Sequence, residues 1–319
     1  MSYTVRIKEE TSKINNSKSE LIAELSGYVR NNGTVQDENV IMTTENKSIV
    51  DHIKDSIESL YNLVPQVKTI NNVNFSKKIL YQITIDTKKS QILKDLGILD
   101  SNNHYLETVP NYVVGGNEEI RAYLRGVFNS TGSINDPKTS RYHMELLITH
   151  PKEAVFIQKL LNLFDLNAKI LNRDKGLMIY IKEAEKISDF LKIIGATNAV
   201  LYFENVRIYR ERKNATNRLN NMEQANMDKV IQTATAQLEE IQIIEENDGV
   251  MLLDDKVKQV LEYRKKYPET SLKELAEIIS LETGKPISKS GLNHRLRKIK
   301  ELAESFKKMK KENTVQNKE

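Results

Sequence analysis

Hydrophobic side chains recur three or four positions apart in two stretches of the chain, residues 21–29 and 120–128. This spacing predicts two helices that each bury one apolar face. Each helix carries an inner glycine, Gly27 or Gly126, on that face. Glycine inside a helix costs about 0.5–1 kcal/mol relative to alanine, so its presence there indicates that another backbone comes close. We therefore predict that the two helices pack glycine to glycine about a pseudo-twofold axis.

A second, outer glycine follows each helix, Gly33 in the first stretch and Gly132 in the second. A small hydroxyl residue and a β-branched apolar residue come next in both stretches. Helices commonly end on a residue in the left-handed conformation, which glycine adopts without strain. We expect the outer glycines to hold that conformation.

The same succession of elements follows both glycine-containing helices. After a short leading helix or arm over 1–18, the first half predicts its glycine-containing helix, a hairpin over 34–44, a helix over 46–63, strands over 66–70 and 78–85, and a helix over 90–97. The second half predicts a helix over 118–129, a hairpin turning at 135–138 and returning over 142–149, a helix over 151–164, strands over 168–172 and 177–182, and a helix over 184–194. Both halves have the order αββαββα, which indicates an internal duplication.

The pattern after the second half is purely helical. A long helix is predicted over 217–245, and the polar triplet 247–249 breaks it. Three shorter helices follow from residue 254, and Ser271 begins the second of them with a capping box. The third helix opens at Ser288 and is rich in cations. This succession is typical of a helix-turn-helix.

We therefore expect an α+β chain, in which a duplicated αββαββα domain precedes a long linker helix and an all-α helix-turn-helix domain. The expected segments are a first half at 1–99, an inter-repeat linker at 100–117, a second half at 118–203, a basic segment and linker helix at 204–253, the helix-turn-helix at 254–306 and a charged, disordered tail at 307–319.

The distribution of charge along the chain indicates a class of binding partner. Net charge is only +4, but Lys and Arg clearly outnumber Asp and Glu in residues 254–319. That local excess favours a nucleic-acid contact in the last domain, although a basic tail that binds nothing would have the same composition. The chain has no Cys, no apolar run long enough for a membrane span and no signal-peptide core at its start. We expect a cytoplasmic, nucleoid-associated protein with no membrane partner.

The third helix of the helix-turn-helix has one apolar face, formed by Leu292, Leu296 and Ile299. At about 100° per residue, four polar side chains point the other way and suit base edges. These four are Ser290, Asn293, His294 and Arg297. The other candidates for DNA contact suit phosphates or flank the turn, namely Lys285, Ser288, Lys289, Arg295 and Lys298. The alternative is an ordinary solvated, charged helix face.

A second cluster of cations precedes the predicted long helix. It comprises Arg207, Arg210, Arg212, Lys213 and Arg218. These side chains could form a second phosphate-contacting patch between the domains. They could equally be structural, capping the long helix and pairing with Glu204 and Glu211. The sequence does not separate the two interpretations.

The duplicated αββαββα unit with a glycine-containing helix in each half resembles the LAGLIDADG homing-endonuclease fold. Over residues 20–305 the chain resembles, more specifically, the WhiA family of DNA-binding regulators. The segments that carry this resemblance are 123–128, 142–145, 180–187, 214–218 and 287–297. The resemblance implies a transcription factor with a degenerate nuclease-like domain and a C-terminal helix-turn-helix. It also implies a role in sporulation, or in cell division and chromosome segregation.

LAGLIDADG nucleases place one carboxylate just before the outer glycine of each copy, and the pair holds divalent metals that activate water. The resemblance puts Asn32 and Thr131 at these positions, and neither side chain can replace a carboxylate. The five His residues are scattered without metal-ligand spacing. We therefore predict no catalytic residue, no metal, no cofactor and no enzyme activity.

The expected function is that of a sequence-specific, DNA-binding transcriptional regulator. Double-stranded DNA is the expected partner, with other transcription or division proteins as further candidates. One alternative is a metal-dependent DNA endonuclease of LAGLIDADG type. Another is a protein-interaction module whose DNA binding is incidental. A monomer is reasonable, because the duplication already supplies an internal twofold.

Overall fold

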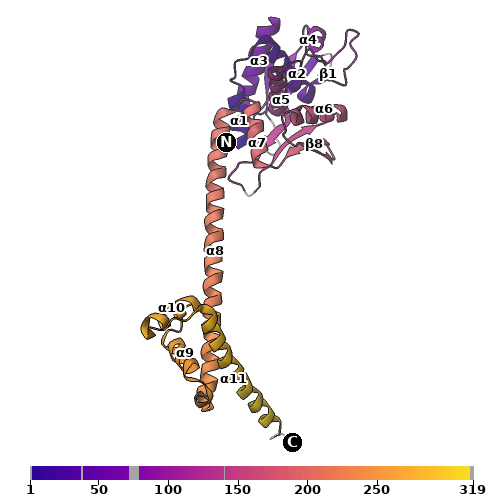
Figure 1. Cartoon of the computed structure of the whole chain (residues 1–319). Coiled ribbons are helices and arrows are strands. Elements are labelled where there is room, and N and C mark those ends of the chain that lie inside the picture. The colour runs from indigo at the N-terminus through magenta and orange to yellow at the C-terminus, as the bar shows by residue number, and fades with distance from the viewer. Residues whose placement is uncertain (1, 37–38, 72–78, 140, 317–319) are drawn as a thin grey trace. The chain divides into compact units, whose positions relative to one another are not determined.

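The computed structural model describes residues 2–36, 39–71, 79–139 and 141–316. The chain divides into two compact units, Met1–Glu211 and Arg212–Glu319 (Figure 1). The first unit contains two β-sheets and two hydrophobic cores, whereas the second is helical throughout its described secondary structure and has one core. The chain is therefore a mixed α+β protein, as its sequence predicts.

The first unit opens with a short helix and then repeats one succession of elements. It begins with α1 (Tyr3–Thr11), followed by α2 (Lys18–Asn32), β1 (Thr34–Gln36), β2 (Asn39–Thr44), α3 (Lys47–Tyr61), β3 (Gln66–Asn71), β4 (Ile79–Ile85) and α4 (Lys89–Asp95). The second repeat comprises α5 (Asn117–Thr131), β5 (Gly132–Ile134), β6 (Met144–Ile148), α6 (Pro151–Leu163), β7 (Lys169–Arg173), β8 (Gly176–Ile181) and α7 (Ala184–Ile193). The predicted αββαββα order is confirmed in both repeats. Residues 37–38 of the first predicted hairpin and residue 78 of a predicted strand lie outside the described residues.

Each repeat forms a four-stranded antiparallel sheet with the same strand order, β1-β2-β4-β3 in the first and β5-β6-β8-β7 in the second. The central strands pair apolar side chains on the buried face. Met42 lies opposite Ile83 in the first sheet, and Leu146 lies opposite Ile179 in the second. All four side chains are buried. Successive side chains of a strand point to opposite faces, so these residues lie on the face of each sheet that packs against the core.

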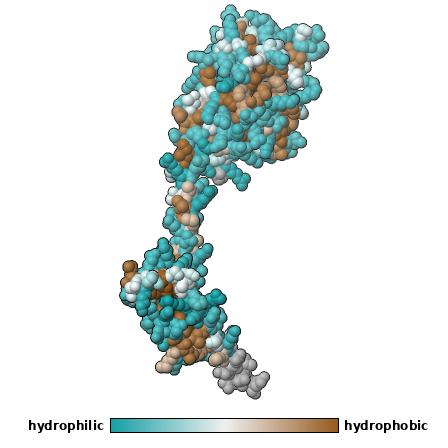
Figure 2. All heavy atoms as spheres, viewed as in Figure 1, coloured by the Kyte–Doolittle hydropathy of each residue, from teal (hydrophilic) through white to brown (hydrophobic). Residues whose placement is uncertain are grey.

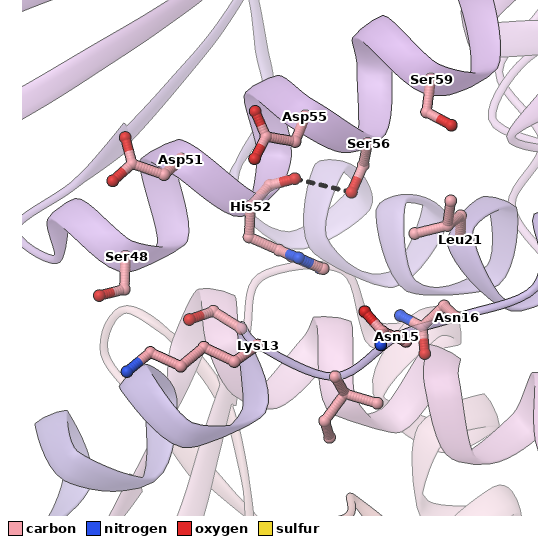
Figure 3. Close-up of a pocket in the computed structure, with 12 residues that line it drawn as sticks. Lys13, Asn15, Asn16, Leu21, Ser48, Asp51, His52, Asp55, Ser56 and Ser59 are labelled. Atoms are coloured by element: carbon pink, nitrogen blue, oxygen red, sulfur yellow. Dashed lines mark hydrogen bonds between the residues drawn. The ribbon is translucent and has the colours of Figure 1, made fainter.

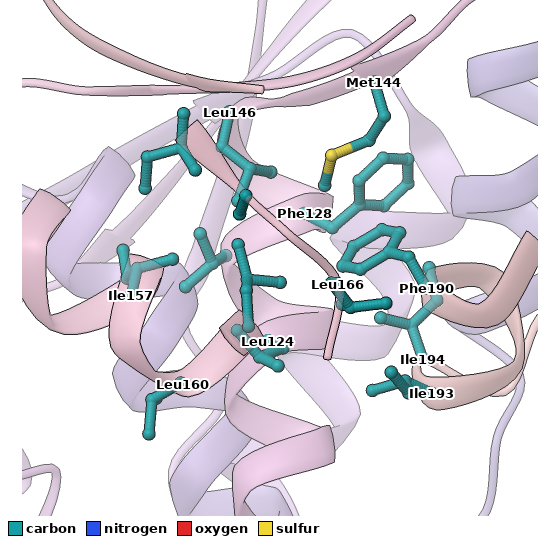
Figure 4. Packing of buried hydrophobic residues seen from close by; sticks show 14 of the residues in the cluster. Leu124, Phe128, Met144, Leu146, Ile157, Leu160, Leu166, Phe190, Ile193 and Ile194 are labelled. Carbon is teal, nitrogen blue, oxygen red and sulfur yellow. The ribbon is translucent and has the colours of Figure 1, made fainter. Parts of the chain in front are cut away.

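Helices cover the buried face of the second sheet. Figure 4 shows Phe128 of α5 beside Met144 of β6 and close to Phe190 of α7. The two phenylalanine rings meet edge to face, with their centroids 5.6 Å apart. Aromatic rings prefer this arrangement to face-to-face stacking, and their large area makes them strong contributors to a core.

The helices α2 and α5 pack against each other at their inner glycines. A methyl group at Gly27 would collide with the backbone carbonyl oxygen of Tyr123, and one at Gly126 would collide with that of Glu24. A backbone carbonyl cannot move aside as the end of a flexible side chain can. Both positions therefore require glycine, and the predicted close approach of two helices is confirmed.

The outer glycines, Gly33 and Gly132, follow the two helices in a different conformation from the expected one. Their φ angles are −72° and −77°, and their ψ angles of 134° and 147° are extended. The left-handed prediction was wrong, because the chain passes directly from each helix into a strand. Space favours glycine here instead: a β-carbon at Gly33 would lie 2.7 Å from the Val29 carbonyl oxygen, and one at Gly132 would meet the Phe128 ring.

The stretch between the repeats, predicted as a linker over residues 100–117, is packed within the first unit. Val109 and Val113 belong to its hydrophobic core. The buried Arg30 guanidinium donates a hydrogen bond to the Leu106 carbonyl oxygen at 3.0 Å. This segment is therefore part of the folded unit and not a loose tether.

The long helix is longer than its sequence pattern indicates. The structure shows one continuous helix, α8 (Thr197–Glu246), which begins well before the predicted start at residue 217 and includes the basic segment. That segment lacks an apolar stripe, but Arg, Glu, Lys and Ala favour helices without one. The predicted break is confirmed at Asp248, whose φ of +52° is left-handed.

The helix-turn-helix order is confirmed in the second unit. After η1 (Gly249–Leu252) come α9 (Asp255–Lys266), α10 (Leu272–Thr283) and α11 (Lys289–Gln316). Ser271 and Glu274 form the predicted capping box, and Gly284 ends α10 with a φ of +66°. The helix α11 continues through residues 307–316, where a disordered tail was expected; residues 317–319 lie outside the described part.

The surfaces seen in Figure 2 are mostly hydrophilic in each unit, with hydrophobic residues in smaller groups. Along α8, the predicted apolar stripe is only partly covered: Ala234 and Ile241 are buried, whereas Leu219 and Met222 are each 56% exposed. In the described residues, no helix is both long enough and apolar enough to cross a membrane.

Candidate nucleic-acid interface

The rotational setting of α11 is fixed by its apolar face. Leu292, Leu296 and Ile299 are almost completely buried in the core of the second unit, together with side chains of α9 and α10. At the start of the helix, the Ser288 hydroxyl accepts a hydrogen bond from the Gly291 backbone N–H at 3.1 Å. The four side chains predicted to point outward are all exposed, namely Ser290, Asn293, His294 and Arg297.

The flanking cations of α11 differ in their surroundings. Lys285 and Lys289 are exposed, whereas Arg295 is half-buried. The Lys298 ammonium lies 3.0 Å from an Asp254 carboxylate oxygen, and this hydrogen bond holds the pKa of Asp254 below its ordinary value. Such exposed ion pairs are weak, so Lys298 can exchange this partner for a phosphate at little cost.

One flank of α11 borders α8, which the sequence did not reveal. A hollow of about 510 Å³ lies between the two helices, lined by Gln237 of α8 and by Asn293, Arg297 and Lys300 of α11, among others. Gln237 is 8% exposed, and its side-chain oxygen has no hydrogen-bond partner among the described residues. Outward-facing polar residues of α11 thus share a surface with α8.

The basic segment of α8 is divided between structural and exposed residues. Arg207 pairs with the carboxylates of Glu204 at 2.9 Å and Glu211 at 3.6 Å, as one of the two interpretations expected. Arg210 donates hydrogen bonds to the carbonyl oxygens of Pro137 and Thr139, at 2.7 and 2.6 Å. Arg207 also pairs with the Glu185 carboxylate of α7 at 3.3 Å, so both arginines connect α8 to other elements of the first unit.

The other three cations of this segment, Arg212, Lys213 and Arg218, are exposed. They do not cap the helix, since α8 runs through all of them. The helix-capping interpretation was therefore wrong for these residues. Their exposure leaves the phosphate-contacting interpretation open for them alone.

The positions that carry carboxylates in LAGLIDADG nucleases lie at the ends of α2 and α5. The Asn32 side-chain oxygen accepts a hydrogen bond from the Thr43 backbone N–H at 2.8 Å. The Thr131 hydroxyl donates to the Val127 carbonyl oxygen at 3.4 Å. Both side chains are thus used within the fold. Across the ranges that the structure describes, no three His, Cys, Asp or Glu side chains are grouped to hold a metal ion.

The contact of α2 with α5 at Gly27 and Gly126 is called the glycine seam below. A buried ionic cluster crosses this seam, and the sequence did not predict it. The Glu24 carboxylate lies 3.1 Å from the Arg125 guanidinium and 3.2 Å from the His52 imidazole. Burial alone would raise the pKa of Glu24, but the His52 hydrogen bond and the Arg125 charge outweigh it and lower the pKa. Charged residues beside the seam glycines, Glu24 near Gly27 and Arg125 next to Gly126, were the available signal.

A second buried ion pair joins the two repeats. The Arg30 guanidinium of α2 lies 3.3 Å from the Glu153 carboxylate of α6. The Tyr123 hydroxyl of α5 also donates a hydrogen bond to Glu153. Burial raises the pKa of Glu153 even though Arg30 opposes that shift. These contacts are structural, because all three side chains are closed off from solvent.

A hollow of about 650 Å³ lies between α3 and the connection from α1 to α2 (Figure 3). Asp51 and Asp55 come from α3, and Lys13 comes from the connection. The Ser56 hydroxyl donates to the His52 carbonyl oxygen at 2.7 Å. The polar residues of this hollow have mixed charge, and their arrangement does not define a ligand.

Three family models match successive parts of the chain. They are the WhiA N-terminal LAGLIDADG-like domain over residues 18–99, the WhiA LAGLIDADG-like domain over 120–213 and the WhiA C-terminal HTH domain over 216–303. The last model begins within α8, so this helix forms part of the matched helix-turn-helix domain.

Close relatives match over nearly the full length. The chain is 39% identical to a protein named "Probable cell division protein WhiA" from Pediococcus pentosaceus, over 96% of this chain and 100% of that one. It is 40% identical to the protein of the same name from Staphylococcus haemolyticus, over 96% and 98% of the two chains. The crystal structure of full-length WhiA from Thermotoga maritima shares the fold, with a TM-score of 0.58, 22% identity and coverage of 96% and 99%. The chain belongs to the WhiA family.

Proposed function

We propose that the protein is a sequence-specific, DNA-binding regulator of transcription that reads base edges with α11. The observation that carries this proposal is the exposed polar face of α11, opposite its buried one. Asn293 suits adenine and Arg297 suits guanine, each through two hydrogen bonds. Lys285 and Lys289, at the turn and the helix start, suit the phosphates that position such a helix.

The names of the relatives, "Probable cell division protein WhiA", support a role in cell division. A DNA-binding protein serves such a role by acting at the genes or chromosomal sites that division, sporulation or chromosome segregation requires. On this proposal the protein works in the cytoplasm on the nucleoid, and other transcription or division proteins are its further partners.

We also infer that the first unit does not cleave DNA. Neither Asn32 nor Thr131 carries the charge with which a carboxylate binds a divalent metal, and both make hydrogen bonds within the fold. The competing function is a metal-dependent endonuclease. Incubating supercoiled plasmid with the protein and Mg²⁺ or Mn²⁺ separates the two. We expect no nicking; nicking that is lost on Asn32→Ala or Thr131→Ala substitution would establish the endonuclease.

Within the basic segment of α8, three residues are available to contribute to DNA binding on this proposal. Arg212, Lys213 and Arg218 are exposed and suit phosphates, whereas Arg207 and Arg210 are engaged within the first unit.

Genome-wide mapping of the DNA that crosslinks to the protein in cells tests the main proposal. We expect discrete sites with a shared sequence, and we expect Asn293→Ala or Arg297→Ala to reduce their occupancy. Lys308→Ala, a charge removal on the same helix beyond the proposed reading face, is the matched control. Sites that persist unchanged in the Asn293 and Arg297 variants would favour a protein-interaction module with incidental DNA binding.

A further inference from the structure

A second hollow in the helix-turn-helix unit collects cations from four helices. It has a volume of about 220 Å³. The cations are Lys229 of α8, Arg264 of α9, Lys273 of α10 and Lys289 of α11. No carboxylate lines it within the described part of the chain. A concave site with four positive side chains and no negative one attracts anions.

Arg264 is the most unusual of the four. It is 1% exposed, and among the described residues it has no acidic partner. One guanidinium nitrogen donates to the carbonyl oxygens of Tyr267 at 3.3 Å and Thr270 at 2.8 Å, while its Nε atom is buried without a partner. Burial lowers the pKa of Arg264 with no carboxylate to oppose the shift. Buried charges in proteins are normally paired, so this guanidinium has unused capacity for an anion.

The N-terminus of α10 lies at the same hollow. The capping box uses the backbone N–H groups of Ser271 and Glu274. Leu272 and Lys273 also line the hollow, and as the first two residues of a helix their N–H groups have no acceptor within it. Helix N-termini carry partial positive charge and bind phosphate groups readily.

The remaining lining residues, Val230, Thr233, Thr270, Ser271 and Leu272, carry no charge. Val230 and Leu272 add apolar surface to the aliphatic stems of the lysines. The Lys273 ammonium has an exposed carboxylate of Glu277 at 4.0 Å, which is too weak a pair to keep it from another anion. Lys289 begins α11, so the hollow adjoins the proposed base-reading helix.

We propose that this hollow is a phosphate site, and that the phosphate belongs to the DNA backbone beside the bases that α11 reads. The source of the phosphate rests on the proposed function; the phosphate chemistry rests on Arg264, the three lysines and the start of α10. The site makes α8 part of the DNA-binding surface through Lys229. A free phosphorylated small molecule offers the same chemistry, and the test separates the two sources.

The test uses the full-length chain and two exposed lysines, because Arg264 also holds the turn before α10. Binding to a short duplex is measured over a range of salt concentrations for the wild type, Lys229→Gln, Lys273→Gln and the control Lys308→Gln. Each lost phosphate contact reduces, by about one unit, the slope of the logarithm of the DNA-binding constant against the logarithm of the salt concentration. We expect that loss in the Lys229 and Lys273 variants, for specific and scrambled duplexes alike, and no change in the control.

A second measurement follows the melting temperature in inorganic phosphate against chloride at equal ionic strength. A phosphate-dependent rise that the Lys229 and Lys273 variants lose, with unchanged salt slopes, supports the site and assigns it to a free phosphorylated molecule. Unchanged slopes without a phosphate response would overturn the site. Failure of the wild type to bind any duplex would overturn the proposed function, while a phosphate response would still support the hollow.

Discussion

Arg297 and Lys298 are neighbours in the chain but meet different surroundings. Arg297 lines the hollow beside α8 and lies 3.3 Å from an exposed Glu301 carboxylate, whereas Lys298 pairs with Asp254. Their directions differ because successive helical residues are rotated by about 100°. A guanidinium on the outward face can fork onto guanine, while an ammonium on its flank meets the backbone as a point charge.

We therefore expect Arg297→Ala to reduce the preference for the native site over random DNA. A good bidentate base contact contributes about 1–3 kcal/mol of discrimination. Lys298→Ala should weaken binding to both duplexes equally and leave the preference intact. Titrations of specific and scrambled duplexes at matched salt measure both quantities. If Arg297→Ala weakens both duplexes to the same extent, this residue contacts phosphate and not bases.

The glycine seam also depends on single atoms. We expect Gly126→Ala to lower the free energy of unfolding by about 1–3 kcal/mol, the usual range for overpacking, because its methyl group meets the Glu24 carbonyl oxygen. Gly116→Ala is the control, since its methyl group meets only the flexible Glu119 side chain. Denaturant unfolding followed by circular dichroism measures both. Small and equal losses at the two sites would contradict a tight seam.

At the scale of elements, the cluster of Glu24, His52 and Arg125 ties three helices together. Glu24 comes from α2, His52 from α3 and Arg125 from α5. Asn129, further along α5, also donates to Glu24, at 3.4 Å. An ionised carboxylate with this many donors resists protonation, which couples the packing of these helices to pH.

The sign of that coupling follows from the lowered pKa of Glu24, whose ordinary value is 4.5. Between the folded and unfolded pKa values, the unfolded state binds more protons. The contribution of Glu24 to stability is therefore complete above about pH 4.5 and is lost as the pH falls through the folded pKa. We expect Glu24→Gln to destabilise the chain at neutral pH and to flatten the fall in stability towards acid.

Denaturant unfolding curves measured from about pH 3 to pH 7, the range in which carboxyl groups titrate, give the free energy of unfolding at each pH. Glu58→Gln removes an exposed carboxylate from α3 and is the control, for which we expect an unchanged profile. An identical acid dependence of stability in the wild type and Glu24→Gln would show that the carboxylate is not held in its ionised form.

The elements with regular apolar spacing were the ones that the sequence predicted well. The order of helices and strands and the setting of α11 follow from alternation and from Leu292, Leu296 and Ile299. The start of α8 at Thr197 was missed. Its first turns have buried apolar side chains, Ala199 and Phe203, but the cation-rich residues 207–218 that follow have no buried apolar side chain to connect them to the predicted helix. The stripe residues Leu219 and Met222 show the converse, since helical spacing does not guarantee burial.

The candidate site was predictable only where it lies on one element. The outward residues of α11 can be read from a single helix. The phosphate hollow could not be found in this way, because its cations, Lys229, Arg264, Lys273 and Lys289, come from four different helices. The missing acidic partner of Arg264 is a feature of three-dimensional packing, and no local pattern records it.

At the scale of the whole molecule, the two repeats of one chain meet in the way that the two copies of a symmetric dimer do. The seam between α2 and α5 is built from equivalent positions of two repeats, which is how the two copies of a twofold dimer meet. Here one chain supplies both copies, while the described residues contain one helix-turn-helix. The internal symmetry of the first unit is therefore not matched, within the described residues, by a second helix of the kind proposed to read bases.

This mismatch leads to an expectation about stoichiometry. Helix-turn-helix dimers bind two half-sites about 34–36 Å apart, so their operators are palindromic. A monomer with one reading helix needs only one such half-site.

We expect sedimentation analysis to give a free mass near the 36.7 kDa of one chain, and one chain per duplex carrying the shortest specific site. We also expect that site to be asymmetric, since nothing in a single reading helix repeats across a dyad. Two chains on a palindromic minimal site would show instead that the protein pairs on DNA through a surface outside the α2–α5 seam, because that seam is already occupied within each chain.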